Sequence, residues 1–179
     1  MIKPRRAVLK IALALCALGW AGQAQADKLV FDHRLAPALK AVLDAGDPAM
    51  VAYDSSNPRN LVDTIAVRGN SAKDWQEALV IVSRTPDSKI RTAAQWRAAL
   101  ERETTARCPG AFDVLAQDSE SITFERRSSG CPSGYPVRAI YRVFASKKAL
   151  FMLAVLAKDD IAAPAREAWL AMLASGRIE

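Results

Sequence analysis

Alternating apolar and polar positions dominate the C-terminal half of the chain and predict β-strands there. Residues 121–127 place apolar side chains on every second position, as in a strand with one buried face, and residues 137–144 alternate in the same way. Residues 149–157 form an unbroken apolar run, which is typical of a strand buried on both faces. A segment rich in Gly, Pro and Ser (residues 128–136) and a short turn (145–148) link these runs. The three strands are therefore expected to form an antiparallel meander.

The remaining segments predict a mixture of helices and strands. Residues 27–31 fit either a short strand or an ordered tail. Strands are expected over residues 50–53, 61–68, 78–83 and 111–116, and helices over residues 33–45, 92–105 and from Pro164 onward.

Glycines and polar residues mark the expected boundaries of these elements. Gly46 is expected to end the first helix, and Gly69 to end the strand over residues 61–68. Asn70 or Ser71 is then expected to cap a short helical turn that carries Trp75. Helices and strands do not alternate as a doubly wound parallel fold requires. The predicted class is α+β, an antiparallel sheet of about five to seven strands with helices packed on it.

Residues 1–26 have the three parts of a secretory signal peptide: a basic start, an apolar run from Ile11 to about Gly22, and small residues before Asp27. The apolar run is shorter than the roughly 20 residues of a membrane-spanning helix. We expect a cleaved leader and a single periplasmic domain over residues 27–179, without a transmembrane segment, in a Gram-negative bacterium. An ordinary basic leader explains the segment more simply than lipidation at Cys16 or twin-arginine export, although the export route stays open.

Export also bears on the cysteines. Cys16 leaves with the leader, and Cys108 and Cys131 remain as an even pair in an oxidising compartment. A structural disulfide between them would remove roughly 3 kcal/mol of unfolded-chain entropy. Two buried free thiols or a redox-active pair are the alternatives, but the chain has no Cys-x-x-Cys motif, the usual context of a redox pair.

The basic character of the chain comes mostly from the leader. The whole sequence carries a net charge of +6, yet four of the 25 Lys and Arg and none of the 19 Asp and Glu lie in residues 1–26, which leaves +2 for the remainder. No basic stripe large enough for nucleic acid survives processing, so no nucleic-acid partner is expected.

Residues that carry catalytic or metal chemistry are sparse in this sequence. His33 is the single histidine, and no Gly-x-Ser-x-Gly, phosphate-binding or dinucleotide-binding motif occurs. Asp159 and Asp160 fit a solvated turn better than a metal site. We therefore expect no catalytic residue, metal or cofactor.

One charged group of residues stands out as a candidate partner-binding surface. Glu125 and Arg127 share a face of one predicted strand, and Arg138, Arg142 and Phe144 share a face of the next. If the two faces coincide, a charged and partly aromatic patch flanks the disulfide loop and fits an acidic partner surface. The alternative is a solvated outer face of the sheet with cross-strand ion pairs.

Several short motifs follow one another in order along the chain. They are Trp75-x-Glu77, an apolar strand, an amphipathic helix, Cys108, Ile122-Thr-Phe-Glu125, Cys131, Tyr141-Arg-Val143 and Arg166-Glu-Ala-Trp169. This order resembles small exported proteobacterial proteins of unassigned function, and it is similar to the Mog1/PsbP-type α+β domain. The resemblance implies a non-catalytic role in binding partners or supporting assemblies, and it supplies no site residues.

Three classes of function are compatible with these observations. The first is a non-catalytic periplasmic protein that binds a protein partner of the cell envelope through the surface around the disulfide loop. The second is an envelope immunity-type protein that neutralises a secreted toxin, and the third is a small periplasmic hydrolase without a recognisable motif. We favour the first, because the constellation that a hydrolase needs is missing.

Overall fold

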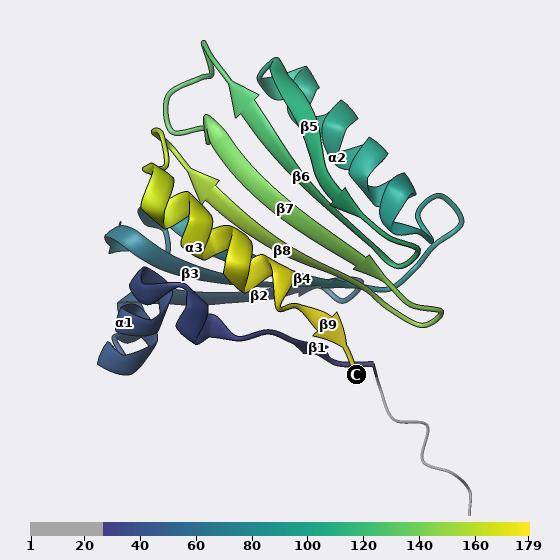
Figure 1. Cartoon of the computed structure of the whole chain (residues 1–179), viewed down its shortest axis with the longest axis horizontal. Coiled ribbons are helices and arrows are strands. Elements are labelled where there is room, and N and C mark those ends of the chain that lie inside the picture. Colours follow the sequence, from purple (N-terminus) through teal and green to yellow (C-terminus); the bar gives the residue numbers. More distant parts are fainter. Residues whose placement is uncertain (1–26) are drawn as a thin grey trace, which may run out of the picture.

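A computed structural model of the chain describes residues 27–179, and its centre is an antiparallel sheet of seven strands (Figure 1). The strands lie in the order β2-β3-β4-β8-β7-β6-β5. Their bounds are β2 (Val51–Asn57), β3 (Asn60–Ser71), β4 (Asp74–Arg84), β5 (Gly110–Gln117), β6 (Ser121–Ser128), β7 (Arg138–Ala145) and β8 (Leu150–Ala157). The predicted leader, with Cys16 and its export signals, lies outside the described residues.

Two meanders, β2–β4 and β5–β8, meet along the pair formed by β4 and β8. The two strands pair antiparallel with Leu79 opposite Val155. After β4 the chain passes through α2 (Ala93–Arg107) to the opposite edge of the sheet and returns strand by strand to β8. β4 and β8 are thus the innermost strands, in agreement with their long apolar runs.

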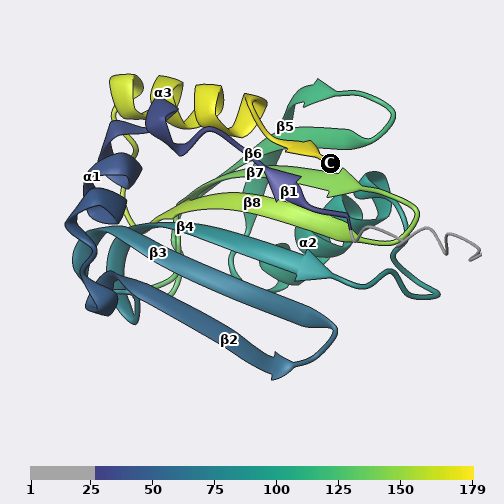
Figure 2. The ribbon, with the colours of Figure 1, turned by 90° about the horizontal axis from the view of Figure 1, so that it is seen from below.

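Helices cover both faces of the sheet (Figure 2). Ile140 and Tyr141 are neighbours in β7 and therefore point to opposite faces. Ile140 packs in a core with Trp169 of α3, whereas Tyr141 packs in a second core with Trp96 of α2. The helical segments besides α2 are η1 (His33–Leu35), α1 (Pro37–Ala45), η2 (Pro48–Met50) and α3 (Ala163–Ala174).

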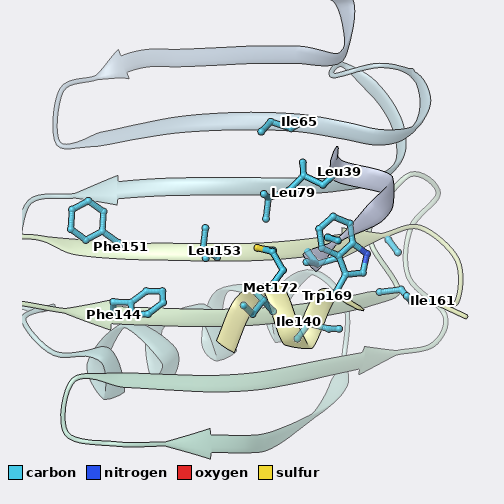
Figure 3. Packing of buried hydrophobic residues seen from close by; sticks show 14 residues of the cluster. Leu39, Ile65, Leu79, Ile140, Phe144, Phe151, Leu153, Ile161, Trp169 and Met172 are labelled. Atoms are coloured by element: carbon cyan, nitrogen blue, oxygen red, sulfur yellow. The ribbon is translucent and has the colours of Figure 1, made fainter. Parts of the chain in front are cut away.

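The larger core lies between the sheet and α1 and α3. Figure 3 shows Trp169 and Met172 of α3 lying over β7 and β8, near Ile140 and Leu153. Burial of each such large apolar side chain contributes about 1.5–3 kcal/mol to folding. The position of α3 on the sheet therefore follows from its apolar stripe.

A two-stranded sheet joins the two ends of the described chain. β1 (Leu29–Val30) pairs antiparallel with β9 (Arg177–Ile178). Beside this pair, the backbone N–H of Lys28 donates to the carbonyl of Glu179 at 2.8 Å, and the N–H of Glu179 donates back at 2.9 Å. Residues 27–31 thus contain the short strand that was one of the two expectations.

Most elements expected from the sequence are confirmed. The class is α+β, the sheet is antiparallel with seven strands, and Cys108 and Cys131 form a disulfide. Thr92 caps α2 through a capping box with Gln95. Gly46 ends α1 in the left-handed conformation, with φ of 65°.

The expected end of β3 at Gly69 and the helical turn around Trp75 are wrong. β3 continues to Ser71, a tight turn follows, and Trp75 lies in β4. The Ser71 hydroxyl accepts hydrogen bonds from the backbone N–H groups of Lys73 and Asp74 at 3.3 and 3.1 Å, which stabilises a hairpin turn rather than a helix. At Gly69 (φ 129°) a Cβ atom would lie 2.6 Å from the carbonyl oxygen of Asp74. This glycine permits the close approach of β3 and β4 instead of ending the strand.

Candidate functional site

The disulfide fixes one end of the sheet, where α2 ends and β6 turns into β7. Cys108 is the fully buried C-cap of α2, and Cys131 lies in the loop of residues 129–137 between β6 and β7. The two Cα atoms are 5.0 Å apart. The bond therefore ties the loop to the end of a helix and limits how far it can move.

A buried arginine of β6, Arg126, also holds this loop in place. Arg126 is 1% exposed, and its guanidinium lies 5.0 Å from the ring of Tyr135. Its hydrogen bonds within the described residues go to neutral oxygens: Nη1 donates to the Ser128 hydroxyl at 2.8 Å, and Nη2 donates to the carbonyl of Pro136. Burial raises the pKa of the nearby Tyr141 to about 12, so that phenol is neutral as well.

The role of Arg126 was missed at the level of sequence, although a signal for it exists. Arg126 shares the alternation of Ile122 and Phe124, which places it on an apolar face of β6. A cation at such a position needs several hydrogen-bond acceptors. The neighbouring loop, rich in Gly, Pro and Ser, contributes one of them, the carbonyl of Pro136.

The strand register brings the predicted patch residues onto one face of the sheet. In the pairing of β6 with β7, Arg127 lies opposite Arg138, Thr123 opposite Arg142, and Ser121 opposite Phe144. Residues directly opposite in an antiparallel pair share a face. The condition set by the sequence, that the two faces coincide, is therefore met.

Three of the five predicted residues line one groove, and two do not. Glu125, Arg127 and Arg138 border a hollow of about 410 Å³, together with Asp160, residues 161–163 and Arg166 at the start of α3. A second hollow of about 700 Å³ shares Arg127, Arg138 and Asp160 and extends along residues 109–111 and 128–129 towards the disulfide loop. We call the two hollows together the arginine groove.

Glu125 forms the fixed floor of the arginine groove. Its side chain is 9% exposed, and both carboxylate oxygens accept from Arg166, from Nε at 3.2 Å and from Nη2 at 2.7 Å. This hydrogen bonding raises the pKa of the Arg166 guanidinium. Nη1 of Arg138 also lies 4.0 Å from the same carboxylate. A buried carboxylate with two such donors is held in one position.

The outer part of the groove is more accessible and richer in donors. Nε of Arg138 donates to Asp160 at 2.8 Å, and the half-exposed Arg127 forms an ion pair with Asp113 of β5. Each guanidinium carries five N–H donors, more than these single contacts use. The groove therefore presents arginine N–H groups that suit planar, acceptor-only groups such as carboxylates.

Arg142 and Phe144 serve the packing of α3. Phe144 is buried, and the Arg142 guanidinium lies 5.0 Å from its ring. Arg142 donates to the carbonyl of Leu173 and to the hydroxyl of Ser121, both at 3.2 Å. Burial lowers the pKa of Arg142. Its cation stabilises the C-terminal end of α3, where the helix dipole is negative.

The solvated outer face that was the alternative to a binding patch is limited, in β6, to its last two residues, Arg127 and Ser128. Residues 121–126 are all buried: Ile122 and Phe124 lie in the core under α2, and Glu125 on the other face is held by Arg166 of α3. Cross-strand and helix-to-sheet ion pairs do occur on this face, as the contacts of Glu125 demonstrate.

Comparisons with protein-family models and with curated proteins found no match for this chain. The resemblance to Mog1/PsbP-type domains stays a prediction. Among residues 27–179 there is no cluster of three or more His, Cys, Asp or Glu placed to hold a metal ion. None of the helices within the same residues is long and apolar enough to cross a membrane. The function must therefore be inferred from the geometry of the groove.

Proposed function

We propose that this chain is a non-catalytic binding protein of the periplasm that docks an acidic protein partner in the arginine groove. The observation that carries the proposal is the cross-strand pair of Arg127 and Arg138. Each of these guanidiniums forms an ion pair with an exposed carboxylate, Asp113 for Arg127 and Asp160 for Arg138, and keeps further N–H donors. The pair therefore places several arginine donors side by side, which suits recognition of carboxylates.

The ionisable groups of the groove favour binding over catalysis. Both oxygens of Glu125 accept from Arg166, so this carboxylate is engaged as a hydrogen-bond acceptor rather than free as a base. Asp160 is likewise engaged with Arg138. The groups that remain available for a ligand are guanidinium N–H donors, which recognise carboxylates without exchanging protons.

The disulfide supports the same function by organising the rim of the groove. Pro109 and Gly110 follow Cys108 directly, and Ser128 and Ser129 precede Cys131 by a few positions. All four residues line the groove. A rim that is held in place before binding loses less conformational entropy when the partner docks.

Site-specific photo-crosslinking in cells tests the proposal. A photoreactive amino acid replaces Ser129 or Ala162 in the groove, or Glu103, which is exposed on α2, as a control. The groove positions should give a defined adduct with an envelope protein, and the control should not. The adduct should be lost in the Arg127→Gln, Arg138→Gln double variant and retained in Arg59→Gln, Arg102→Gln, which removes two exposed arginines elsewhere. Equal adducts at all positions, or none at the groove, would refute the proposal.

A further inference from the structure

The two carboxylates that line the arginine groove differ in how firmly they are held. Glu125 is 9% exposed, and its two oxygens accept from Arg166. The Asp160 side chain is 76% exposed and accepts from Nε of Arg138 at 2.8 Å and from the backbone N–H of Ile161 at 3.1 Å. Water and other anions therefore reach Asp160 far more readily than Glu125.

Asp160 also stands where the two hollows meet. It borders both of them, as do Arg127 and Arg138. A group that binds the Arg138 guanidinium from either hollow therefore lies beside Asp160. Exposed ion pairs of this kind contribute little to folding, so exchanging Asp160 for another carboxylate costs the protein little.

We infer that the Asp160 carboxylate is an internal competitor, which holds Arg138 in the free protein at the position that a carboxylate of the bound partner takes. The inference rests on the proposed function and names the recognised group: a carboxylate on an acidic segment of a protein. The argument for a carboxylate is that the group already seated on Arg138 is one. Binding then transfers Arg138 from Asp160 to the partner, and Arg127 contributes further donors beside it.

The neighbouring residue offers a matched control. Asp159 is also exposed and ion-paired, but its partner is Arg68 of β3, and it does not line the groove. Asp159→Asn and Asp160→Asn change the net charge equally at adjacent positions. An asparagine at 160 keeps an oxygen that accepts from the Ile161 N–H, so the turn into α3 is retained.

The experiment measures the affinity of a rhodamine-labelled peptide of alternating Glu and Gly by fluorescence anisotropy, with a Gln-for-Glu peptide as the ligand control. Asp160→Asn should bind the acidic peptide about two- to fivefold more tightly than the unmodified protein. Asp159→Asn should bind with unchanged affinity. Arg138→Gln should bind more weakly, and adding Asp160→Asn to it should restore nothing, because the competitor acts through Arg138.

The outcomes separate this inference from the proposed function. If Arg138→Gln weakens binding but Asp160→Asn has no effect, the groove binds acidic segments and Asp160 is not a competitor. If Asp159→Asn strengthens binding as much as Asp160→Asn, the effect is one of net charge, and the inference is again refuted. If Arg138→Gln leaves the affinity unchanged, the proposed function fails as well.

Discussion

The indole Nε1 of Trp169 donates a 2.6 Å hydrogen bond to the carboxylate of Glu77, and both residues are buried. This contact joins α3 to β4 in the middle of the sheet. Trp169 lies one helical turn after Arg166, which holds the floor of the arginine groove. The position of one wall of the groove thus depends on a buried contact beneath it.

Loss of this hydrogen bond should be costly. Trp169→Phe leaves the buried Glu77 carboxylate without its indole donor and should lower the free energy of unfolding by about 1–3 kcal/mol beyond the loss of packing. Trp96→Phe, in the core under α2, removes a similar volume and serves as the control. Urea denaturation followed by circular dichroism measures both. Equal losses in the two variants would contradict a special role for the contact between Trp169 and Glu77.

The disulfide should stabilise the fold through the loop that it closes. Cys108 and Cys131 are separated by 23 positions. Reduction, or replacement of both cysteines by Ala, should lower the free energy of unfolding by about 3 kcal/mol, because the unfolded chain regains the entropy of an open loop. Denaturant titrations with and without a reducing agent measure the change. An unchanged midpoint in the reduced protein would show that the bond adds nothing to stability.

Stability should fall in acid partly because of Asp87. A hydrogen bond from Arg84, followed by backbone N–H donors of Ile90 and Lys89, lowers the pKa of this carboxyl from 3.8 to about 2. On acidification the carboxyl of Asp87 is therefore protonated at a higher pH in the unfolded state than in the folded state. The contribution of Asp87 is complete above the unfolded pKa and disappears as the pH falls towards about 2.

Asp87→Asn tests this pH dependence, because the variant and the unmodified protein are compared at every pH. The stability difference between the protein and the variant should be largest near neutral pH and should shrink as the pH falls through about 2. Denaturant titrations across this range measure the difference. A difference that stays constant down to pH 2 would contradict the assigned cause.

Local patterns were sufficient to predict most of the elements. The alternation in residues 121–127 and the apolar run in residues 149–157 predict β6 and β8, because a strand exposes successive side chains to opposite faces. Helix α2 and the disulfide follow from equally local features, the amphipathic pattern over residues 92–105 and the even pair of cysteines that remains after the expected leader. Gly69 shows the limit of such features, since its role depends on how closely β4 approaches.

The candidate site was predictable only in part, because it is built from contacts between distant segments. The alternation placed Glu125, Arg127 and Arg138 on faces that do coincide. Arg166 and Asp160 belong to the groove because they contact Glu125 of β6 and Arg138 of β7, residues far from them in sequence, which no local pattern reveals. The same packing buries Phe144 and engages the partly buried Arg142 with the end of α3.

Nuclear magnetic resonance titration with the alternating Glu-Gly peptide tests the central claim most directly. A separate hollow outside the arginine groove serves as the comparison. It lies near the start of α2 and is lined by the cations Arg91, Lys147 and Lys148. Binding in the arginine groove should shift the backbone amide signals of residues 128–129 and 161–163, with little change around the separate hollow. Shifts centred on Lys147 and Lys148, or equal in the groove and the separate hollow, would show that the peptide follows charge alone and that the arginine groove is not a specific binding site.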